Sequence, residues 1–306
     1  MSTQNKKVAV IGLGSMGMGI ADSLMRAGFD VSGCDIRDDA LARLAKRGGR
    51  SSTRPSEIDS DCAVIICVVV SAAQVDTVLF GADGVAAQLK PGTLVMVCST
   101  VAPEFAAATA ARLGERGVLY LDAPISGGAV KAAEGKLSIM ASGADEAFAM
   151  VKDITDAIAE KIYRIGDHAG QGSSMKMINQ LLAGIHIAAA AEAMSLAAKV
   201  GLDARMVYEV ICHSAGMSWM FENRVPHIQD GDYEARSAVN IFIKDLGIVL
   251  DTAKTQRFPT PLAATAHQLF TMAASAGMGD WDDAAVAKVY ECLSDIALPH
   301  KESSGT

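Results

Sequence analysis

The fold is decided by the stretch KVAVIGLGSMG, which occupies residues 7–17. Residues 7–11 are mostly β-branched and apolar, as expected of a buried strand, and a helical apolar pattern follows the stretch. Between them lie Gly12, Gly14 and Gly17. In a G-x-G-x-x-G turn the first glycine permits the tight turn, the second lets the backbone approach a pyrophosphate, and the third lets helix and strand pack closely. Because the helix N-terminus offers amide donors to phosphates, the stretch predicts a Rossmann dinucleotide site.

Asp35 completes this motif at the end of the second expected strand, about 20 residues further on. Its carboxylate is expected to bind the adenosine ribose and to repel a 2′-phosphate, which favours NAD over NADP. Arg37 leaves that choice open, since an arginine at this place binds such a phosphate. The alternative is that the glycines only make a turn and Asp35 only ends a strand. With the loops after the third and fourth strands, the expected cofactor-binding residues are Gly12, Leu13, Gly14, Ser15, Met16, Gly17, Asp35, Val69, Val70 and Thr100.

The first half of the chain alternates short β-rich runs with helical patterns, which is typical of an α/β protein with a doubly wound parallel sheet. The runs are rich in Val, Ile and Leu without polar alternation, as expected of strands buried on both faces. We expect strands at Lys7 to Ile11, Asp30 to Cys34, Ala63 to Val69, Leu94 to Cys98, Val118 to Asp122 and Leu137 to Ala141.

The second half is helical in pattern. Residues 173–200 contain many Ala, Met and Leu residues and no proline, which predicts one long helix with Ser173 as its N-cap and Gly201 as its left-handed C-terminal cap. A frayed polar tail is expected at residues 301–306. We therefore predict a NAD-binding Rossmann domain at residues 1–166. An all-helical substrate and oligomerisation domain at 167–306 would begin with the long interdomain helix.

Composition and charge exclude several classes of protein. The chain has 306 residues, of which 50% are hydrophobic and 20% charged, and its formal net charge is −8. A negative chain without clusters of Lys and Arg argues against nucleic acid as a partner. No uninterrupted apolar run approaches the roughly 20 residues that span a bilayer, so we expect a cytoplasmic protein with no membrane partner. The six cysteines have no zinc-type spacing, so no metal is expected.

A carboxylate-binding loop is expected at Asp122-Ala123-Pro124-Ile125-Ser126-Gly127-Gly128, which ends a strand. Ser126 supplies a hydroxyl, and Gly127 and Gly128 supply amides without side chains, which makes a natural nest for a substrate carboxylate. Taken alone, the segment is also compatible with an ordinary turn.

Lys176 and Asn179 lie three residues apart on the long helix, so both project from one face. The same face continues with Gln180, Ala183 and Ile187. A lone lysine near a helix start is more often a solvated surface residue. Here the flanking apolar residues Met175, Met177 and Ile178 favour burial.

A mechanism follows if Lys176 faces the nicotinamide. Desolvation and the positive ring of the cofactor would both favour the neutral amine, which then acts as a base near neutral pH. Lys176 would take the hydroxyl proton of the substrate while a hydride leaves the same carbon, and Asn179 would orient the amine or the substrate. This chemistry needs no metal.

These residues together resemble the β-hydroxyacid dehydrogenases, the family of 3-hydroxyisobutyrate dehydrogenase. The resemblance covers nearly the whole chain through the glycine turn, the Ser99-Thr100-Val101-Ala102-Pro103 loop, the segment 122–128, Gly170-Gln171-Gly172 with Lys176 and Asn179, and Lys244-Asp245-Leu246. It implies a Rossmann domain followed by a helical domain, a catalytic lysine at Lys176, and a second lysine at Lys244 that reaches the cofactor and substrate. A homodimer or homotetramer through helix packing is also expected.

Within the family, residues 213–224 and 237–247 most resemble the L-threonate dehydrogenases. Commoner members carry a Phe ahead of the second lysine, where this chain reads Ser237-Ala238-Val239-Asn240-Ile241-Phe242-Ile243. That departure favours a small anionic acid more polar than 3-hydroxyisobutyrate. Asn240 and Ser218 are expected to serve its extra hydroxyls, or else to be cap or surface residues. Trp219 and Phe221 are expected to fill core.

Other activities stay open at this stage. 3-Hydroxyisobutyrate dehydrogenase and tartronate semialdehyde or glyoxylate reductase are the nearest alternatives, because they share the same expected machinery. An imine reductase has the same architecture, but Lys176 and Asp35 oppose that reading. A non-catalytic NAD-binding module is possible in principle, since a fold does not fix a function.

Overall fold

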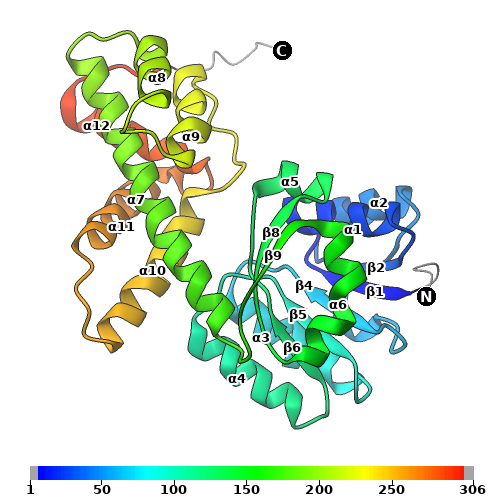
Figure 1. Ribbon diagram of the computed structural model, residues 1–306. Coiled ribbons are helices and arrows are strands. Elements are labelled where there is room, and N and C mark those ends of the chain that lie inside the picture. The colour runs from blue at the N-terminus through cyan, green and yellow to red at the C-terminus, as the bar shows by residue number, and fades with distance from the viewer. Residues whose placement is uncertain (1–5, 300–306) are drawn as a thin grey trace. The chain divides into compact units, whose positions relative to one another are not determined.

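A computed structural model describes residues 6–299 of the chain. It divides into two compact units, which we call unit 1, ending at Lys176, and unit 2, beginning at Met177. The tail expected at residues 301–306 lies outside the described residues. The domain boundary expected at residues 166 and 167 stays a prediction. The two units are described separately below (Figure 1).

Unit 1 is built on a sheet that has nine strands among the described residues, eight of them in the order β3-β2-β1-β4-β5-β6-β8-β7, with β9 paired to β8. Pairs from β3 to β6 are parallel, whereas β8 runs antiparallel to β6 and β7. The strands are β1 (Lys7–Ile11), β2 (Asp30–Cys34), β3 (Arg50–Ser52), β4 (Val64–Cys67), β5 (Leu94–Val97), β6 (Leu119–Asp122), β7 (Ile125–Ser126), β8 (Leu137–Ser142) and β9 (Ala159–Gly166).

Helices cover both faces of this sheet, which explains why its strands lack polar alternation. Val8 and Val10 of β1 pack with α1, α2, α5 and α6 on one face, and Ala9 and Ile11 pack with α3 and α4 on the other (Figure 1). The α-helices of this unit before the long helix are α1 (Ser15–Arg26), α2 (Asp38–Lys46), α3 (Ala72–Phe80), α4 (Pro103–Gly114), α5 (Gly128–Glu134) and α6 (Asp145–Ile158).

All six expected strands are present, with ends shifted by at most two residues. Three further strands were not expected. β3 and β9 are mostly exposed and β7 has two residues. Their sequences therefore lack the continuous apolar run that marked the others, and pairing with a neighbouring strand defines them. The expected parallel sheet is confirmed for the pairs from β3 to β6, and β8 adds an antiparallel part because short connections through β7 reverse the chain there.

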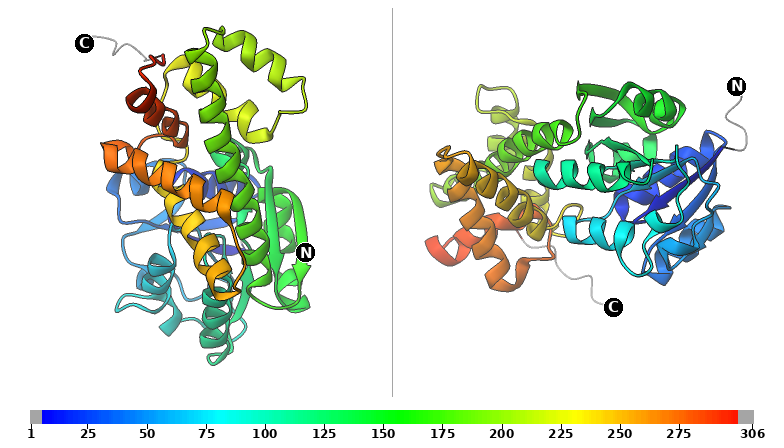
Figure 2. Two further views of the ribbon diagram at one scale, coloured as in Figure 1. Left: turned by 90° about the vertical axis from the view of Figure 1, so that its left-hand side faces the viewer. Right: turned by 90° about the horizontal axis from the view of Figure 1, so that it is seen from below.

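Unit 2 is helical apart from an isolated bridge between Ala238 and Asp282. The long helix α7 (Gln171–Lys199) begins in unit 1 and continues into unit 2. Its core joins α7 to α10 and α11, and Figure 2 shows α10 and α11 side by side. The other helices are α8 (Ala204–Cys212), α9 (Trp219–Asp230), α10 (Val239–Thr255), α11 (Pro261–Ala273), a π-helical turn (Ala274–Met278), a 3-10 turn (Asp283–Ala287) and α12 (Lys288–Ser294).

The ends of α7 test the two expected caps. Gly201 follows the helix with a φ of +79°, and the Leu202 N–H donates to the Ala197 carbonyl, so the left-handed C-terminal cap is confirmed. The N-cap expected at Ser173 is wrong, since Ser173 lies inside the helix. By length and composition α7 could cross a membrane, as can many core helices, and half of its most apolar window is buried in the protein.

The core prediction is confirmed for Phe221, which is 4% exposed, and wrong for Trp219, which is 53% exposed. Trp219 is the first residue of α9 and does not belong to the small apolar cluster that Phe221 joins.

Candidate active site

The glycine turn joins β1 to α1 in unit 1 and has room for no side chain at two of its positions. Gly12 has a φ of +93°, and a Cβ on Gly17 would lie 1.8 Å from the Gly12 carbonyl oxygen. Gly14 is the N-cap of α1, and no side chain caps this helix. The first amides of α1 are therefore available to an anion, as the phosphates of a dinucleotide require.

Asp35 is bound to this turn. Its carboxylate accepts the Leu13 N–H at 2.7 Å and the Arg37 N–H at 2.9 Å, and the Arg37 Nε lies 3.3 Å away. Burial opposes ionisation of Asp35, but these hydrogen bonds and the guanidinium outweigh it, so the pKa of the carboxyl lies below its ordinary value. Asp35 is therefore ionised at neutral pH and fixed beside the turn. Oδ1 already accepts two N–H groups of Arg37, whereas Oδ2 accepts only the Leu13 N–H and keeps a lone pair for another donor.

Two further loops follow the carboxyl ends of β4 and β5. Ser71 and Gln74 form a capping box at the start of α3, and the Gln74 side chain also accepts the Val70 N–H at 2.8 Å. The Ser99 hydroxyl donates to the Val69 carbonyl at 2.6 Å, which ties the two loops together beside Thr100. The expected cofactor-binding residues of unit 1 thus lie on loops at one edge of the parallel strands, where such ligands bind.

The segment expected to bind a carboxylate contains β7 and the start of α5. Ser126 is partly exposed, and Gly127 and Gly128 have φ values of +135° and +75°. Asp122, the first residue of this segment, is fully buried and faces elsewhere.

The first turn of α7 is hydrogen-bonded to the ends of two strands. The Asp122 carboxylate accepts the N–H groups of Gly170 at 2.9 Å and Ser173 at 2.8 Å, and the Ser173 hydroxyl at 2.7 Å. The Ser142 hydroxyl accepts the Gly172 N–H at 2.9 Å. Ser173 therefore donates where the sequence predicted that it would accept, because Gly170 occupies the end of the helix and side chains from β6 and β8 supply the cap.

Lys176 lies one turn after Gly172 and is only 7% exposed. Its burial is confirmed, although the expected reason is wrong, since the neighbouring Met175 and Ile178 are 42% and 50% exposed in this chain. The buried stripe follows the face predicted from spacing, which continues through Gln180, Ala183 and Ile187.

Unit 2 contains a series of linked polar side chains that connects two predicted site residues, Asn179 and Lys244. The Asn179 amide donates to the Gln180 side-chain carbonyl at 2.9 Å, and the Gln180 amide donates to the Asp245 carboxylate. Asp245, which is 2% exposed, also pairs with the Lys244 ammonium at 2.7 Å. Sequence reasoning gave Asp245 no role, although a carboxylate next to a site lysine was the signal for one.

Two families of known proteins match this chain. The family described as the NAD binding domain of 6-phosphogluconate dehydrogenase matches residues 7–166, and the family described as NAD-binding of NADP-dependent 3-hydroxyisobutyrate dehydrogenase matches residues 170–290. The chain belongs to the β-hydroxyacid dehydrogenase family. The protein accordingly binds a nicotinamide dinucleotide and is an oxidoreductase that acts on a CH–OH group.

Three similar β-hydroxyacid dehydrogenases illustrate the match. The L-threonate dehydrogenase of Cupriavidus necator is 54% identical, with 97% of this chain and 99% of the relative covered. That of Escherichia coli K12 is 50% identical, with 97% of each covered. A crystal structure named 3-hydroxyisobutyrate dehydrogenase, from Salmonella typhimurium, is 52% identical, has a TM-score of 0.89, and matches 92% of this chain and 99% of its own.

Two predicted substrate contacts of this β-hydroxyacid dehydrogenase have local partners. The Ser218 hydroxyl accepts the Phe221 N–H at 3.0 Å as the N-cap of α9. The Asn240 amide donates to Asp280 at 3.2 Å on the surface. Ser218 therefore has the cap role that the sequence left open as an alternative, and a contact of Asn240 with the substrate stays a prediction.

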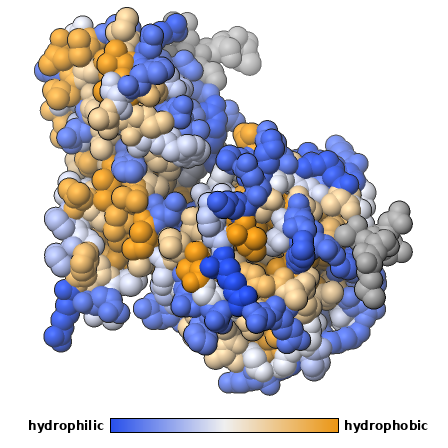
Figure 3. Space-filling model, viewed as in Figure 1, coloured by the Kyte–Doolittle hydropathy of each residue, from blue (hydrophilic) through white to orange (hydrophobic). Residues whose placement is uncertain are grey.

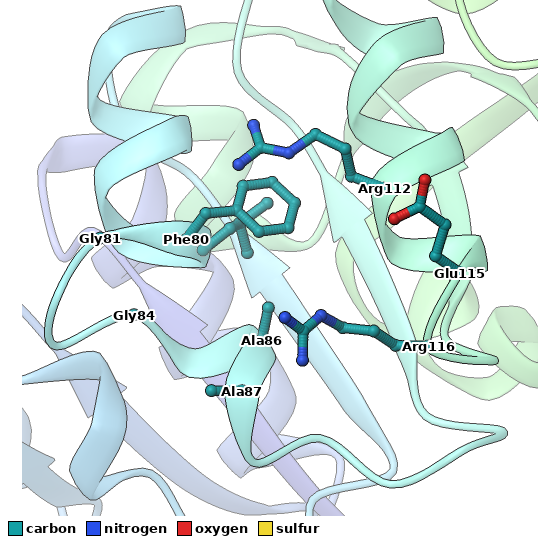
Figure 4. Close-up of a pocket in the computed structure, with 9 residues that line it drawn as sticks. Phe80, Gly81, Gly84, Ala86, Ala87, Arg112, Glu115 and Arg116 are labelled. Carbon is teal, nitrogen blue, oxygen red and sulfur yellow. The ribbon is translucent and has the colours of Figure 1, made fainter.

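A cavity of about 190 Å³ in unit 1 lies away from the family's cofactor loops (Figure 4). Arg112 stacks 3.6 Å from the centre of the Phe80 ring beside it. Both residues end helices that lead into β5 and β6, so the cavity is at the amino ends of the strands, opposite the edge where dinucleotides bind. Across residues 6–299, no three His, Cys, Asp or Glu side chains are grouped to hold a metal.

Proposed function

We propose that this β-hydroxyacid dehydrogenase oxidises a small sugar acid with NAD, and that the acid is L-threonate, which becomes its 2-oxo acid. The observation that carries the proposal is Lys176, a lysine buried to 7% exposure in the same unit as the glycine turn. The similar L-threonate dehydrogenases support the choice of acid, because they match this chain over almost its whole length.

The described residues fit a nicotinamide dinucleotide. Where a Cβ would stand on Gly14, no other atom lies within 4 Å, which leaves open space for a pyrophosphate at the uncapped start of α1. When bound, the cofactor accepts a hydride from the carbon that bears the hydroxyl. The residues proposed to hold it are those of the turn, Gly12 to Gly17, with Asp35, Val69, Val70, Thr100 and Lys244.

Lys176 is proposed as the base. Its Nζ, in the neutral form, takes the hydroxyl proton of the acid. Asn179, one turn further along α7, is proposed to orient the amine or the substrate. Ser126, Gly127 and Gly128 are proposed to bind the carboxylate, and Asn240 a further hydroxyl.

NAD is preferred to NADP in this proposal. Asp35 is ionised and held by Leu13 and Arg37, so a 2′-phosphate would meet a fixed negative charge. Arg37 pairs with Asp35 and also donates to the Leu13 carbonyl at 3.2 Å, which engages the guanidinium that could otherwise bind that phosphate.

Lys176→Ala tests the proposal directly. The purified variant should lose turnover of L-threonate by at least 10²-fold, since general base catalysis contributes about 10²–10⁴-fold, while its NAD dissociation constant changes little. Lys199→Ala, at the other end of the same helix, is the control and should keep wild-type turnover. Full activity of Lys176→Ala would refute the mechanism.

A panel of acids read by NADH absorbance tests the substrate. It contains L-threonate, glycerate and 3-hydroxyisobutyrate with NAD, and tartronate semialdehyde and a cyclic imine with NADH. We expect the highest kcat/KM with L-threonate. Faster turnover of 3-hydroxyisobutyrate would instead favour the activity for which the similar Salmonella structure is named, and a reaction with cyclic imines alone would indicate an imine reductase.

We also propose that the protein is a homodimer or homotetramer assembled through unit 2. Several large apolar side chains of this unit are exposed in the single chain, and Figure 3 shows such residues gathered over it. They include Leu196, Val200, Leu202, Met206 and Val210. Sedimentation equilibrium should give a multiple of the chain mass, and a monomer at micromolar concentration would contradict this.

A further inference from the structure

The start of α7 is capped by two strands and not by its own sequence. The first amide groups of a helix have no partner within the helix. Here Gly170 stands at the end of the helix and has no side chain, and Ser174 N–H makes the first helical bond, to the Gly170 carbonyl at 2.8 Å. The amides of Gly172 and Ser173 are bound by the side chains of Ser142 and Asp122. The cap therefore comes from residues 30 and 51 positions away in the chain.

The two capping side chains are placed by the sheet. Asp122 and Ser142 are the last residues of β6 and β8, and they face each other in the antiparallel pairing of these strands. Both are fully buried. Their positions are therefore as fixed as the backbone of the strands, and water does not compete for their hydrogen bonds.

Backbone contact fixes the rotation of α7 as well as its start. A Cβ on Gly172 would lie 2.4 Å from the Met140 carbonyl oxygen and 2.8 Å from that of Asp122. This face of the helix thus packs directly on β6 and β8. Lys176 follows Gly172 by four residues and projects from the same face, so whatever fixes Gly172 also fixes Lys176.

We propose that Asp122 is a positioning residue that holds the first turn of α7, and with it Lys176, at the end of the sheet. Its carboxylate accepts three hydrogen bonds from that turn, two from amides and one from the Ser173 hydroxyl. A carboxylate at this end of a 29-residue helix also interacts favourably with the helix dipole. This role rests on the proposed function, because it matters for turnover only if Lys176 is the base.

Asp122→Ala tests the proposal in the full-length protein. With L-threonate and NAD, we expect kcat to fall by about 10²-fold, the loss that a misplacement of about 1 Å produces, while the NAD dissociation constant changes by less than about 2-fold. The primary isotope effect on kcat with C2-deuterated L-threonate should rise, because hydride transfer becomes limiting when the base is misplaced. A role in stability alone would leave the isotope effect unchanged.

Asp203→Ala is the matched control. Asp203 is exposed and caps α8 in unit 2 by accepting the Met206 N–H at 2.8 Å, so its loss removes a helix cap that does not hold Lys176. We expect this variant to keep kcat within about 2-fold of wild type. An equal fall of kcat in both variants would show that the effect of Asp122→Ala is general destabilisation and would overturn the proposal.

Asp122→Asn separates hydrogen-bond geometry from folding. The asparagine oxygen can accept both amides, and the Ser173 hydroxyl can turn to accept the asparagine N–H. We therefore expect Asp122→Asn to recover most of the kcat lost in Asp122→Ala. Equal losses in the two variants would contradict positioning by hydrogen bonds.

Hydrogen exchange gives a readout that is independent of the substrate. A peptide that covers residues 170–180 should exchange at least 10-fold faster in Asp122→Ala than in wild type or Asp203→Ala. Unchanged exchange and unchanged kcat in Asp122→Ala, with Lys176→Ala inactive, would refute the positioning role alone. Full turnover by Lys176→Ala would instead refute the proposed function.

Discussion

Gly14→Ala and Gly17→Ala should separate cofactor binding from packing in the glycine turn. A Cβ on Gly17 would stand 1.8 Å from the Gly12 carbonyl oxygen, against the 3.0 Å that real Cβ atoms keep. The turn and α1 must therefore separate by about 1.2 Å, and overpacking of this kind costs about 1–3 kcal/mol. A unit of this size loses about 2–4 °C in Tm per kcal/mol, so Gly17→Ala should lower the Tm by about 2–12 °C.

Gly14→Ala should behave in the opposite way. No atom lies within 4 Å of a Cβ built there, and its φ of −62° suits alanine. We expect the Tm of the free protein to change by no more than about 4 °C, because such replacements change stability by about 0.4–1 kcal/mol. The methyl group would instead occupy the space that a pyrophosphate needs, and NAD should bind at least 10-fold more weakly.

Thermal unfolding with and without NAD measures both effects. At an NAD concentration 100 times its dissociation constant, the wild type gains about 2.7 kcal/mol, whereas a variant that binds 10-fold more weakly gains about 1.4 kcal/mol. Gly114→Ala, at the end of α4 with open space around it, is the control and should match the wild type. A Gly14→Ala variant with wild-type affinity, or a Gly17→Ala variant with wild-type Tm, would refute the reasoning.

Three further changes have defined outcomes. Asp35→Ser should lower the ratio of kcat/KM for NAD to kcat/KM for NADP by about 10–100-fold, because hydrogen bonds to a charged group contribute about 1.5–3 kcal/mol. An unchanged ratio would show that Asp35 does not select the cofactor. Burial raises the pKa of Cys34 and Cys62 to about 11. An aromatic disulfide reagent at pH 8 should therefore modify the exposed Cys292 first and these two thiols only after unfolding. Rapid labelling of Cys34 in the folded protein would contradict its burial. Ser71→Ala removes half of the capping box of α3 and should lower the unfolding free energy by about 1 kcal/mol. Urea unfolding would show this as a lower midpoint concentration, and an unchanged midpoint would contradict the prediction.

The strands that were predicted and those that were missed differ in burial. β1 and β4 are apolar at successive positions because both faces of the sheet are covered, and that pattern is visible in the sequence. β9 reads AEKIYRIG and is mostly exposed, so its sequence resembles a loop. Its pairing with β8 defines it as a strand.

The candidate site also has features that the sequence predicted and features that it did not. Gly12 and Gly17 are next to each other in space because they are near each other in the chain, so their spacing predicted the turn. Asp245 was part of a quoted motif, yet its links to Lys244 and, through Gln180, to Asn179 depend on how α7 packs on α10. Spacing along one helix placed Lys176 and Asn179 on one face, but no spacing connects that face to α10.

The sequence by itself determined the dinucleotide turn, the α/β and helical halves, and the helix face of Lys176, because each depends on residues within a few positions of one another. Only the tertiary structure decided what holds the start of α7. Serine is a residue type that often caps helices, but the Asp122 carboxylate, 51 positions away in the chain, accepts hydrogen bonds from the amide and the hydroxyl of Ser173. A buried amide bonds to whichever acceptor the packed sheet brings within reach, and sequence order does not reveal which one that is.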